Sequence, residues 1–340
     1  MKPKTKYSFI ILSILLLLCI ALNISLGSVS IDFTEVISSI FGYAENQSHQ
    51  YIIQNYRLPK AITAILVGSG LGISGLLMQT LFRNPLAGPF VLGISSGASL
   101  GVALIILGSG LFGGFLAAAL LSKWSIVIAA SLGSFLVLLA VLAVSSKVRD
   151  TMAILIIGLM FGSITAAIVS VLSYFSSAEQ LQQYIFWGFG NLGNLTWNEL
   201  IIFLGIYFTG IIFSIASLKA LDSFLLGENY AKSLGLNIKQ SRLTIILATS
   251  LLAGTITAFA GPIAFIGLAI PHLTRQIFDS SNHKILLPAV FLFGAIVMLI
   301  CDTIAQLPTS DYTLPINAIT SLVGAPVVVW LLVRQRKMVF

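Results

Sequence analysis

Charged residues are scarce in this sequence. Of its 340 residues, only 18 are lysine or arginine and 11 are aspartate or glutamate, together 9%. Soluble globular domains carry about 25% charged residues, which they need to cover a surface in contact with water. The composition therefore excludes a soluble enzyme and a nucleic-acid-binding module. The net charge of +7 needs another explanation.

Cysteine and histidine are also rare, with two and three copies. Cys19 and Cys301 each lie inside an apolar run, and neither has a histidine or a second cysteine at a spacing that suits a shared metal ion. We therefore expect two buried thiols, with no disulfide, no metal site and no cofactor.

The sequence lacks the motifs of common nucleotide-dependent and hydrolytic enzymes. No lysine follows a glycine, which excludes a Walker A loop, and there is no H-E-x-x-H zinc motif. The matches to G-x-G-x-x-G follow no strand of a βαβ unit, and the G-x-S-x-G match at 93–97 has no histidine near it in the sequence. We predict that the chain is not an enzyme. Glycines spaced four apart, such as Gly68 and Gly72, instead suit close packing of helices in lipid.

Long apolar runs dominate the chain, which is 57% apolar with a mean hydropathy of +1.02. One bilayer span needs about 20 apolar residues. We expect an all-α, polytopic membrane protein with about ten transmembrane helices in a single transmembrane domain over residues 1–340. The predicted apolar segments are approximately 8–22, 61–81, 91–108, 124–145, 151–173, 198–218, 243–260, 263–271, 285–305 and 316–333.

Two of these segments allow alternatives. The first follows the lysines of MKPKTKY and could be a signal peptide, but no small-x-small cleavage site follows it cleanly, which favours an uncleaved helix. The segment 263–271 is too short to span a bilayer alone. We expect it to extend into the sequence PHLTR or to be sheltered by other helices.

The distribution of basic residues predicts the orientation. If the N-terminus is cytoplasmic, three basic residues, Arg57, Lys60 and Lys123, fall on the outer side, which leaves 15 of the 18 on the cytoplasmic side. Cytoplasmic loops of membrane proteins carry an excess of lysine and arginine. This pattern predicts that both termini are cytoplasmic, and it accounts for the positive net charge.

Arg57 and Lys60, in the sequence YRLPK, are exceptions to this bias. Pro59 suits the first turn of a helix, and residues spaced three apart would share one helix face. Two roles fit the pair: anchors that extend to the membrane interface, or a docking site for an acidic partner.

A predicted cytoplasmic loop contains the sequence LLGENYAKSLG. Gly227 can break the preceding structure, Glu228 would open a short helix where negative charge suits the dipole, and Gly235 would end it. Ala231 and Leu234 would then share one face. We expect this short amphipathic helix to lie in the groove of a partner protein rather than on the membrane.

The sequence RNPLAGP, residues 83–89, joins two predicted spans on the cytoplasmic side. Its two X-Pro pairs exclude a regular helix. Irregular backbone at membrane depth is tolerated only where it is buried in protein or lines a cavity. A tight structural turn is the alternative.

Together these stretches resemble the permease subunits of the vitamin B12 and iron-chelate class of ABC importers, the FecCD-type family. The resemblance covers nearly the whole chain. The matching stretches are RLPK (57–60), SGLLMQTLFRNPLAGPFVLG (74–93), SSGAS (95–99), LGENYAKSLG (226–235), AGPIAFIGLAIPHLTR (260–275) and LVGAP (322–326).

The resemblance implies a permease domain over residues 1–340, with 219–240 as a cytoplasmic coupling loop. It implies a homodimer in a bacterial inner membrane, two copies of a cytoplasmic ABC ATPase, and a periplasmic or lipoprotein substrate-binding protein. The expected function is translocation of an iron chelate (siderophore) by alternating access, driven by the partner ATPase. Cobalamin and haem are alternatives within the family, and an ATP-independent secondary transporter is the alternative outside it.

The resemblance also implies roles for individual residues. The expected ATPase-coupling residues are Gly227, Glu228, Ala231, Leu234 and Gly235; the binding-protein docking residues are Arg57 and Lys60; and the cytoplasmic gate residues are Asn84, Leu86 and Thr151. The sequence departs from the family at three positions. Gln306 replaces a third basic docking residue, and Thr313 and Asn317 replace an acidic residue and a glycine.

Overall fold

The computed structural model describes residues 3–44, 46–90, 92–111, 121–145, 151–308, 310 and 312–334. Regular secondary structure in these residues is helical throughout, which confirms the all-α prediction. Each predicted apolar segment overlaps one or more helices. These are α1 (Pro3–Ser25), α4 (Leu58–Leu81), α5 (Ile94–Ile106), α7 (Lys123–Ser145), α8 (Thr151–Tyr174), α10 (Trp197–Ala216), α13 (Ile238–Thr249) continued by η3 (Ser250–Gly254) and α14 (Thr255–Ala260), α15 (Ile266–Phe278), α16 (His283–Ala305) and α17 (Ile316–Arg334).

Among the described residues, seven helical runs are long and apolar enough to cross a membrane. The apolar parts of α5 and α17 are shorter. The chain is therefore a multi-span membrane protein, and the count of ten spans stays a prediction.

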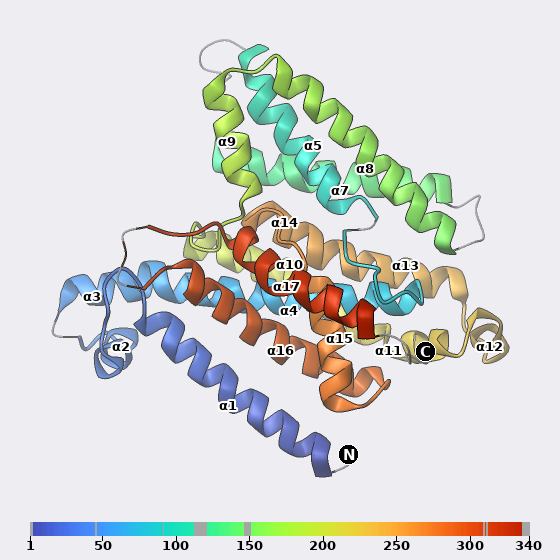
Figure 1. The fold of residues 1–340 in the computed structure, drawn as a ribbon, viewed down its shortest axis with the longest axis horizontal. Helices are drawn as coiled ribbons and strands as arrows, with labels where there is room; N and C mark the ends of the chain where they lie inside the picture. The colour runs from blue at the N-terminus through green and yellow to red at the C-terminus, as the bar shows by residue number, and fades with distance from the viewer. Residues whose placement is uncertain are drawn as a thin grey trace.

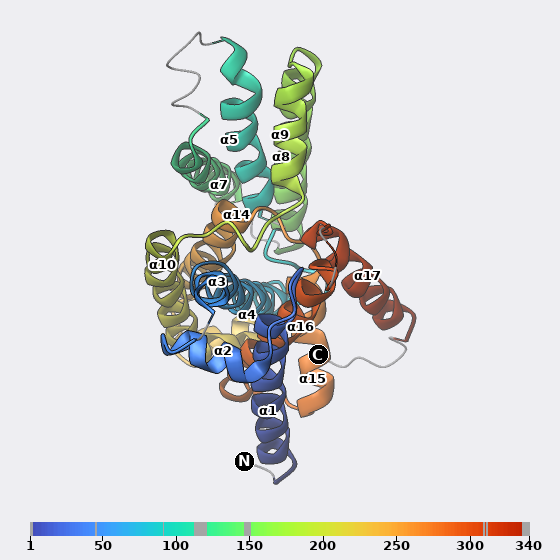
Figure 2. The same ribbon diagram turned by 90° about the vertical axis from the view of Figure 1, so that its left-hand side faces the viewer.

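Helix α4 lies at the centre of the fold, and nearly all of its residues are buried. Helices α15 and α16 pack against it, α1 packs on α16, and α10 and α13 cover another side (Figure 1). Helices α5, α7 and α8 form a second group with α9 (Ala178–Gly188), which Figure 2 shows standing apart from the α4 bundle. The segment η3–α14 contacts both groups.

The two ends of the molecule carry different short helices. One end, here called the outer end, holds α2 (Phe33–Ile40) and α3 (Gln47–Ile52). The opposite end, here called the inner end, holds α11 (Leu218–Leu225) and α12 (Glu228–Ser233), together with the start of α1 and the end of α17 (Figure 1). The two ends of the described chain thus lie on the same side as α12, as the sequence predicted.

Glycines allow the central helices to approach closely. A β-carbon on Gly68 would lie 2.5 Å from the Cβ atom of Met298, and one on Gly75 would lie 2.6 Å from the carbonyl carbon of Gly267. Real Cβ atoms essentially never come within 3.0 Å of another heavy atom. These contacts confirm that the glycine pattern serves packing.

The structure corrects two predicted helix boundaries. The helix that contains the predicted segment 61–81 begins well before it, because α3, the π-helical turn η1 (Ile53–Arg57) and α4 form one continuous run, with Pro59 in the first turn of α4 as expected. Proline has no N–H to donate, so the helical hydrogen-bond pattern changes just before it. The segment 263–271 begins as a helix only at Ile266, and α15 continues to Phe278 with most of its residues buried. The expected extension into PHLTR is confirmed.

Candidate functional site

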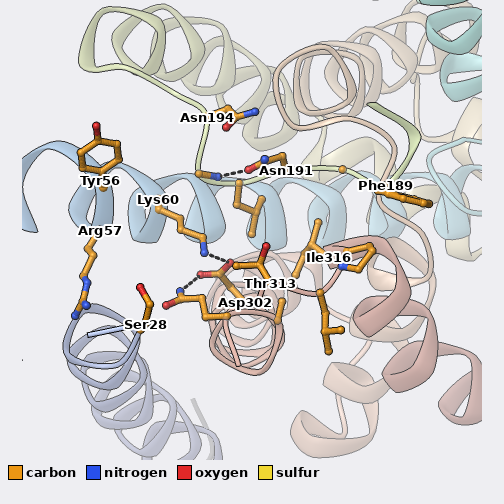
Figure 3. A pocket seen from close by; sticks show the side chains of 18 of the residues that line it. Ser28, Tyr56, Arg57, Lys60, Phe189, Asn191, Asn194, Asp302, Thr313 and Ile316 are labelled. Atoms are coloured by element: carbon orange, nitrogen blue, oxygen red, sulfur yellow. Dashed lines mark hydrogen bonds and ion pairs between the residues drawn. The ribbon is translucent and has the colours of Figure 1, made fainter. Parts of the chain in front are cut away.

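A polar pocket of about 670 Å³ opens at the outer end (Figure 3). It lies between the end of α1, the η1–α4 junction, the loop after α9, the end of α16 and the segment before α17. Its lining includes Tyr56, Arg57, Lys60, Asn191, Asp302, Gln306 and Thr313.

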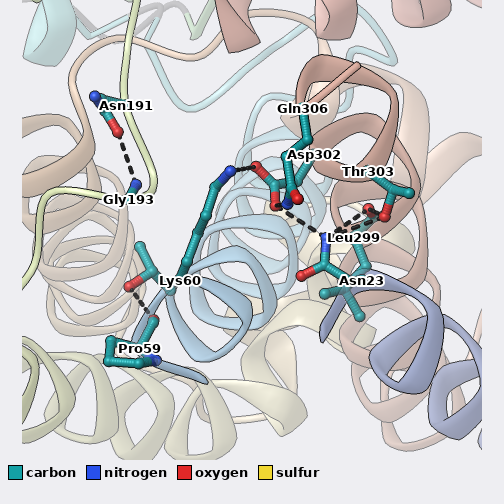
Figure 4. A network of polar contacts seen from close by, with 10 residues as sticks. Asn23, Pro59, Lys60, Asn191, Gly193, Leu299, Asp302, Thr303 and Gln306 are labelled. Atoms are coloured by element: carbon teal, nitrogen blue, oxygen red, sulfur yellow. Dashed lines mark hydrogen bonds and ion pairs between the residues drawn. The ribbon is translucent and has the colours of Figure 1, made fainter. Parts of the chain in front are cut away.

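Lys60 meets a buried carboxylate in this pocket. Its Nζ atom lies 3.1 Å from Oδ1 of Asp302, whose side chain is 2% exposed, whereas the Lys60 side chain is 23% exposed. The other carboxylate oxygen, Oδ2, accepts hydrogen bonds from the amides of Asn23 (2.9 Å) and Gln306 (2.8 Å). Figure 4 shows how this network joins α1, α4 and α16. A buried carboxylate is tolerated only when paired and hydrogen-bonded in this way.

Arg57 also binds within the chain. Its guanidinium donates to the carbonyl oxygens of Ile24 (2.7 Å) and Ser25 (2.9 Å), and to that of Val29. The last carbonyls of a helix have no intrahelical partner, and a cation near the helix C-terminus also suits the dipole. Arg57 therefore holds the outer end of α1 as well as lining the pocket.

The three departures from the family pattern have distinct surroundings. Gln306 takes part in the Asp302 network, and Thr313 lines the pocket. Asn317 has a structural role: its Oδ1 accepts from the Ala264 N–H (3.0 Å) and its Nδ2 donates to the Gly188 carbonyl (3.4 Å). Because Gln306 is neutral, it donates a hydrogen bond to Asp302 and leaves the negative charge of Asp302 to be balanced by Lys60.

At the inner end, residues 83–89 form an irregular turn, here called the inner turn. The Asn84 side chain accepts from the N–H of Leu86 (2.9 Å), which fixes a tight Asx turn. Leu86 is 46% exposed, whereas Ala87 and the two residues after it are buried. The prediction that this backbone is buried in protein is confirmed for its second half, and the tight turn describes its first half.

Gln79 holds the base of the inner turn. It is buried on α4, its Nε2 donates to the Leu268 carbonyl on α15 (3.1 Å), and its backbone carbonyl accepts from the Asn84 N–H (3.1 Å). Pro89 at the far end of the turn lies where a β-carbon on Gly267 would come within 2.7 Å of it. The inner turn is thus packed against α15 as well as against α4.

Thr151, the third predicted gate residue, is the first residue of α8. Its side chain lies outside the described part of the structure. The structure therefore brings Asn84 and Leu86 together, and a meeting of Thr151 with them stays a prediction.

The predicted loop helix is present as α12. Gly227 precedes it with φ +105°, and Gly235 follows it with φ +82°, both in the region that favours glycine. Glu228 opens the helix, as predicted, and its Oε1 accepts a hydrogen bond of 2.6 Å from Arg242 on α13. The boundaries of α12 are therefore confirmed, and Glu228 has a partner within the chain.

The amphipathic face of α12 differs from the prediction. Ala231 is fully buried against the protein, whereas Leu234 is 58% exposed, so the two do not share a face. The reason is that the helix ends at Ser233, which leaves Leu234 in the cap. The exposed apolar side chains are instead Leu226, Tyr230 and Leu234, each four residues from the next.

A groove of about 330 Å³ separates the inner turn from α12. Phe82 and Arg83 line one side of it, and Leu226, Gly227 and Tyr230 line the other. Nothing in the sequence predicted this proximity, because about 140 residues lie between the two segments and tertiary packing, including that of α11 against α4, brings them together.

Comparisons with known proteins agree with this architecture. The FecCD transport family matches residues 15–334. The chain is 34% identical to the hemin transport system permease protein HmuU of Yersinia pestis, covering 99% of this chain and 97% of that protein. It is 36% identical to the vitamin B12 import system permease protein BtuC of Klebsiella pneumoniae, covering 84% of each. A solved structure described as an inward-facing metal-chelate type ABC transporter superposes with a TM-score of 0.81 at 29% identity, covering 97% of this chain and 99% of that one.

Proposed function

Because the chain belongs to the FecCD transport family, we propose that it forms the membrane pathway through which an ABC importer brings an iron chelate into a bacterial cell. The chain is an ABC importer permease of the metal-chelate type, a transport subunit rather than an enzyme. In the proposed complex, two copies of the chain form a homodimer in the inner membrane. Two cytoplasmic ATPases bind its inner end, and a periplasmic or lipoprotein binding protein delivers the substrate to its outer end.

The observation that carries this proposal is the exposed apolar surface of α12. Helix α12 lies at the inner end (Figure 1), and three apolar side chains in it or beside it are exposed there: Leu226, Tyr230 and Leu234. Exposed apolar side chains on and beside a helix of six residues suit the groove of a partner protein. The inner turn forms the opposite wall of the groove beside α12. An ATPase that binds α12 would therefore also move the inner turn.

The inner turn is the proposed cytoplasmic gate. Asn84 and Leu86 are placed on a rigid Asx turn, and Leu86 is exposed there. When the two ATPases bind ATP and close, they would push on α12 and move the inner turn. The gate at one end of the pathway would then open while the gate at the other end shuts. Thr151 at the start of α8 is the proposed third gate residue.

The outer pocket is the proposed docking site for the binding protein. An acidic side chain of that protein would reach Lys60, whose side chain is partly exposed, and would compete with Asp302 for it. Arg57 is held by backbone carbonyls and would be available only if the end of α1 moved.

An iron chelate of the siderophore type is the proposed substrate, with haem and cobalamin as the alternatives. Relatives are named for hemin and for vitamin B12, and both of these are large metal chelates. An ATP-independent secondary transporter is not favoured, since the relatives are ABC permeases and Asp302 is already paired with Lys60.

The first test is purification of the protein from its native membrane in mild detergent, with the bound proteins identified and counted. We expect an ATP-binding subunit at one copy per permease chain. Reconstituted liposomes are then supplied with the binding protein and with ⁵⁵Fe-siderophore, hemin or cyanocobalamin. Uptake of the ⁵⁵Fe-siderophore only with ATP supports the proposal in full. ATP-dependent uptake of hemin or cyanocobalamin alone supports the permease role and overturns the proposed substrate, and uptake by the lone chain without ATP would overturn the permease role.

A single substitution tests the role of α12. Leu234→Asp places a charge in the apolar contact and should release the ATPase and abolish uptake, while the protein remains in the membrane. Ser233→Asp is the matched control, because Ser233 is the exposed neighbour and gains the same charge away from Leu234. Equal ATPase binding by both variants would contradict the proposed contact.

A further inference from the structure

A chain of side-chain hydrogen bonds, exposed at Asp222 and buried at His283 and Thr80, crosses the inner end from α11 to α4. His283, the first residue of α16, is fully buried. Its Nδ1 atom lies 2.7 Å from Oδ1 of Asp222 on α11, and its Nε2 atom lies 2.9 Å from Oγ1 of Thr80 on α4. Arg275 of α15 donates to the same hydroxyl at 3.3 Å. We call the side chains of Asp222, His283 and Thr80 the His283 bridge.

The Asp222 end of the bridge is a strong anchor. Its Oδ1 atom also accepts the backbone N–H of His283 at 3.0 Å. Burial raises the pKa of the Asp222 carboxyl, but the hydrogen bonds from His283 and the charge of Lys284 outweigh burial and hold that pKa below its usual value. Asp222 is therefore anionic at neutral pH, and Nδ1 of His283 carries the proton that it accepts. Hydrogen bonds to an ionised acceptor are the stronger ones.

The two ends of the bridge belong to the two elements that the proposed mechanism must connect. Asp222 lies on α11, which is joined to α12 by only two residues, both tied back to α11 by hydrogen bonds: Leu226 N–H to Ser223 and Gly227 N–H to Phe224. Thr80 lies in the last turn of α4, and its carbonyl accepts the N–H of Arg83, the first residue of the inner turn (3.2 Å).

The bridge adds polar contacts to the direct packing of α11 against α4, and these contacts are buried at His283 and Thr80. An imidazole ring is planar, and its two nitrogens are used in nearly opposite directions. Because His283 and Thr80 are buried, a displacement of α11 that broke these bonds would leave polar groups unpaired away from water. Arg83, which also approaches α12 across the groove, is an exposed and flexible side chain.

We propose that His283 is a positioning residue for coupling: through Asp222 and Thr80, it passes movement of the α11–α12 unit to the inner turn. This inference rests on the proposed function, because it assumes that an ATPase moves α12. It predicts that breaking the bridge separates ATP hydrolysis from movement of the gate.

The test follows the gate directly and needs no substrate. A reporter parent carries Leu86→Cys, whose thiol is accessible, whereas Cys19 and Cys301 are buried and react slowly. The complex with its ATPase is treated with a water-soluble maleimide, with and without ATP and vanadate. Alkylation rate and ATP hydrolysis are measured for the parent, for Thr80→Val and for His283→Ala.

Matched variants separate positioning from packing. Thr80→Ser keeps the hydroxyl and should behave as the parent. Thr274→Val makes the same change at a buried threonine of α15 whose hydroxyl donates only to its own helix, at the Ile270 carbonyl (2.8 Å). We expect Thr80→Val and His283→Ala to hydrolyse ATP while the ATP-dependent change in alkylation rate falls at least fivefold, a typical size for coupling between two sites.

Each outcome decides the inference. Loss of the response in Thr80→Val, with the response kept in Thr80→Ser and Thr274→Val, supports it. A full response in Thr80→Val and His283→Ala overturns it, and so does an equal loss in Thr274→Val. The original protein without Leu86→Cys is the reference for the proposed function: if its complex hydrolyses no ATP, the proposed function fails, whereas a complex that hydrolyses ATP and responds in Thr80→Val as in the parent contradicts the bridge alone.

Discussion

Replacing Gly75 by alanine should force α4 and α15 apart. A β-carbon at this position would lie 2.6 Å from the carbonyl carbon of Gly267 and closer still to its oxygen, whereas ordinary contact begins at 3.4 Å. The obstacle is backbone, so no side chain can rotate away. The two helices must separate by at least the difference, 3.4 − 2.6 = 0.8 Å.

The energetic cost can be worked out from this geometry. Overpacking of a well-packed core costs about 1–3 kcal/mol, and a backbone obstacle places Gly75→Ala at the upper end. Separation also weakens the bond from Gln79 to the Leu268 carbonyl, worth about 1 kcal/mol. Alanine gains about 1 kcal/mol over glycine as a helix former. The net destabilisation should be about 2–3 kcal/mol.

Thermal unfolding in detergent, followed by size-exclusion chromatography, measures this cost. Gly205→Ala is the matched control, because Gly205 lies in α10 with no heavy atom within 4 Å of the added carbon. We expect that control to be as stable as the original protein or slightly more stable. If Gly75→Ala unfolds at the same temperature as Gly205→Ala, the close helix contact is not a determinant of stability and the reasoning is wrong.

Two further predictions concern ionised groups. Lys60→Met should destabilise the protein by about 2 kcal/mol, which is less than for a fully buried pair because Lys60 is partly exposed. Adding Asp302→Asn should recover at least half of this loss in the same unfolding assay. If the effects of the two substitutions simply add, the pairing of Lys60 with Asp302 is contradicted. Because its folded pKa lies below the ordinary 3.8, Asp222 contributes stability that is present above 3.8 and lost as pH falls through the folded pKa. The stability difference between the original protein and Asp222→Asn should therefore shrink as the pH falls below about 4, and a difference that grows below that pH would refute this assignment.

Local signals in the sequence predicted the long helices and the limits of α12, since apolar runs and glycines act over a few residues. Short helices such as α2, α9 and α11 were not predicted, because they lack long apolar runs. The candidate site depended more on contacts between distant residues. Lys60 was identified as a basic exception, but its partner Asp302 lies on another helix, and the Thr80–His283–Asp222 contacts join three helices. Such pairings follow from tertiary packing and have no signal in a single sequence.

The buried half of the inner turn also constrains how the chain can assemble during synthesis. Irregular backbone in a membrane must be covered by protein, and part of the cover for Gly88 and Pro89 comes from Gly267 and Leu268, about 180 residues later. A ribosome adds about 5–20 residues per second, so these segments wait roughly 9–36 s for their cover. The second half of the inner turn must therefore remain without this part of its cover until α15 emerges.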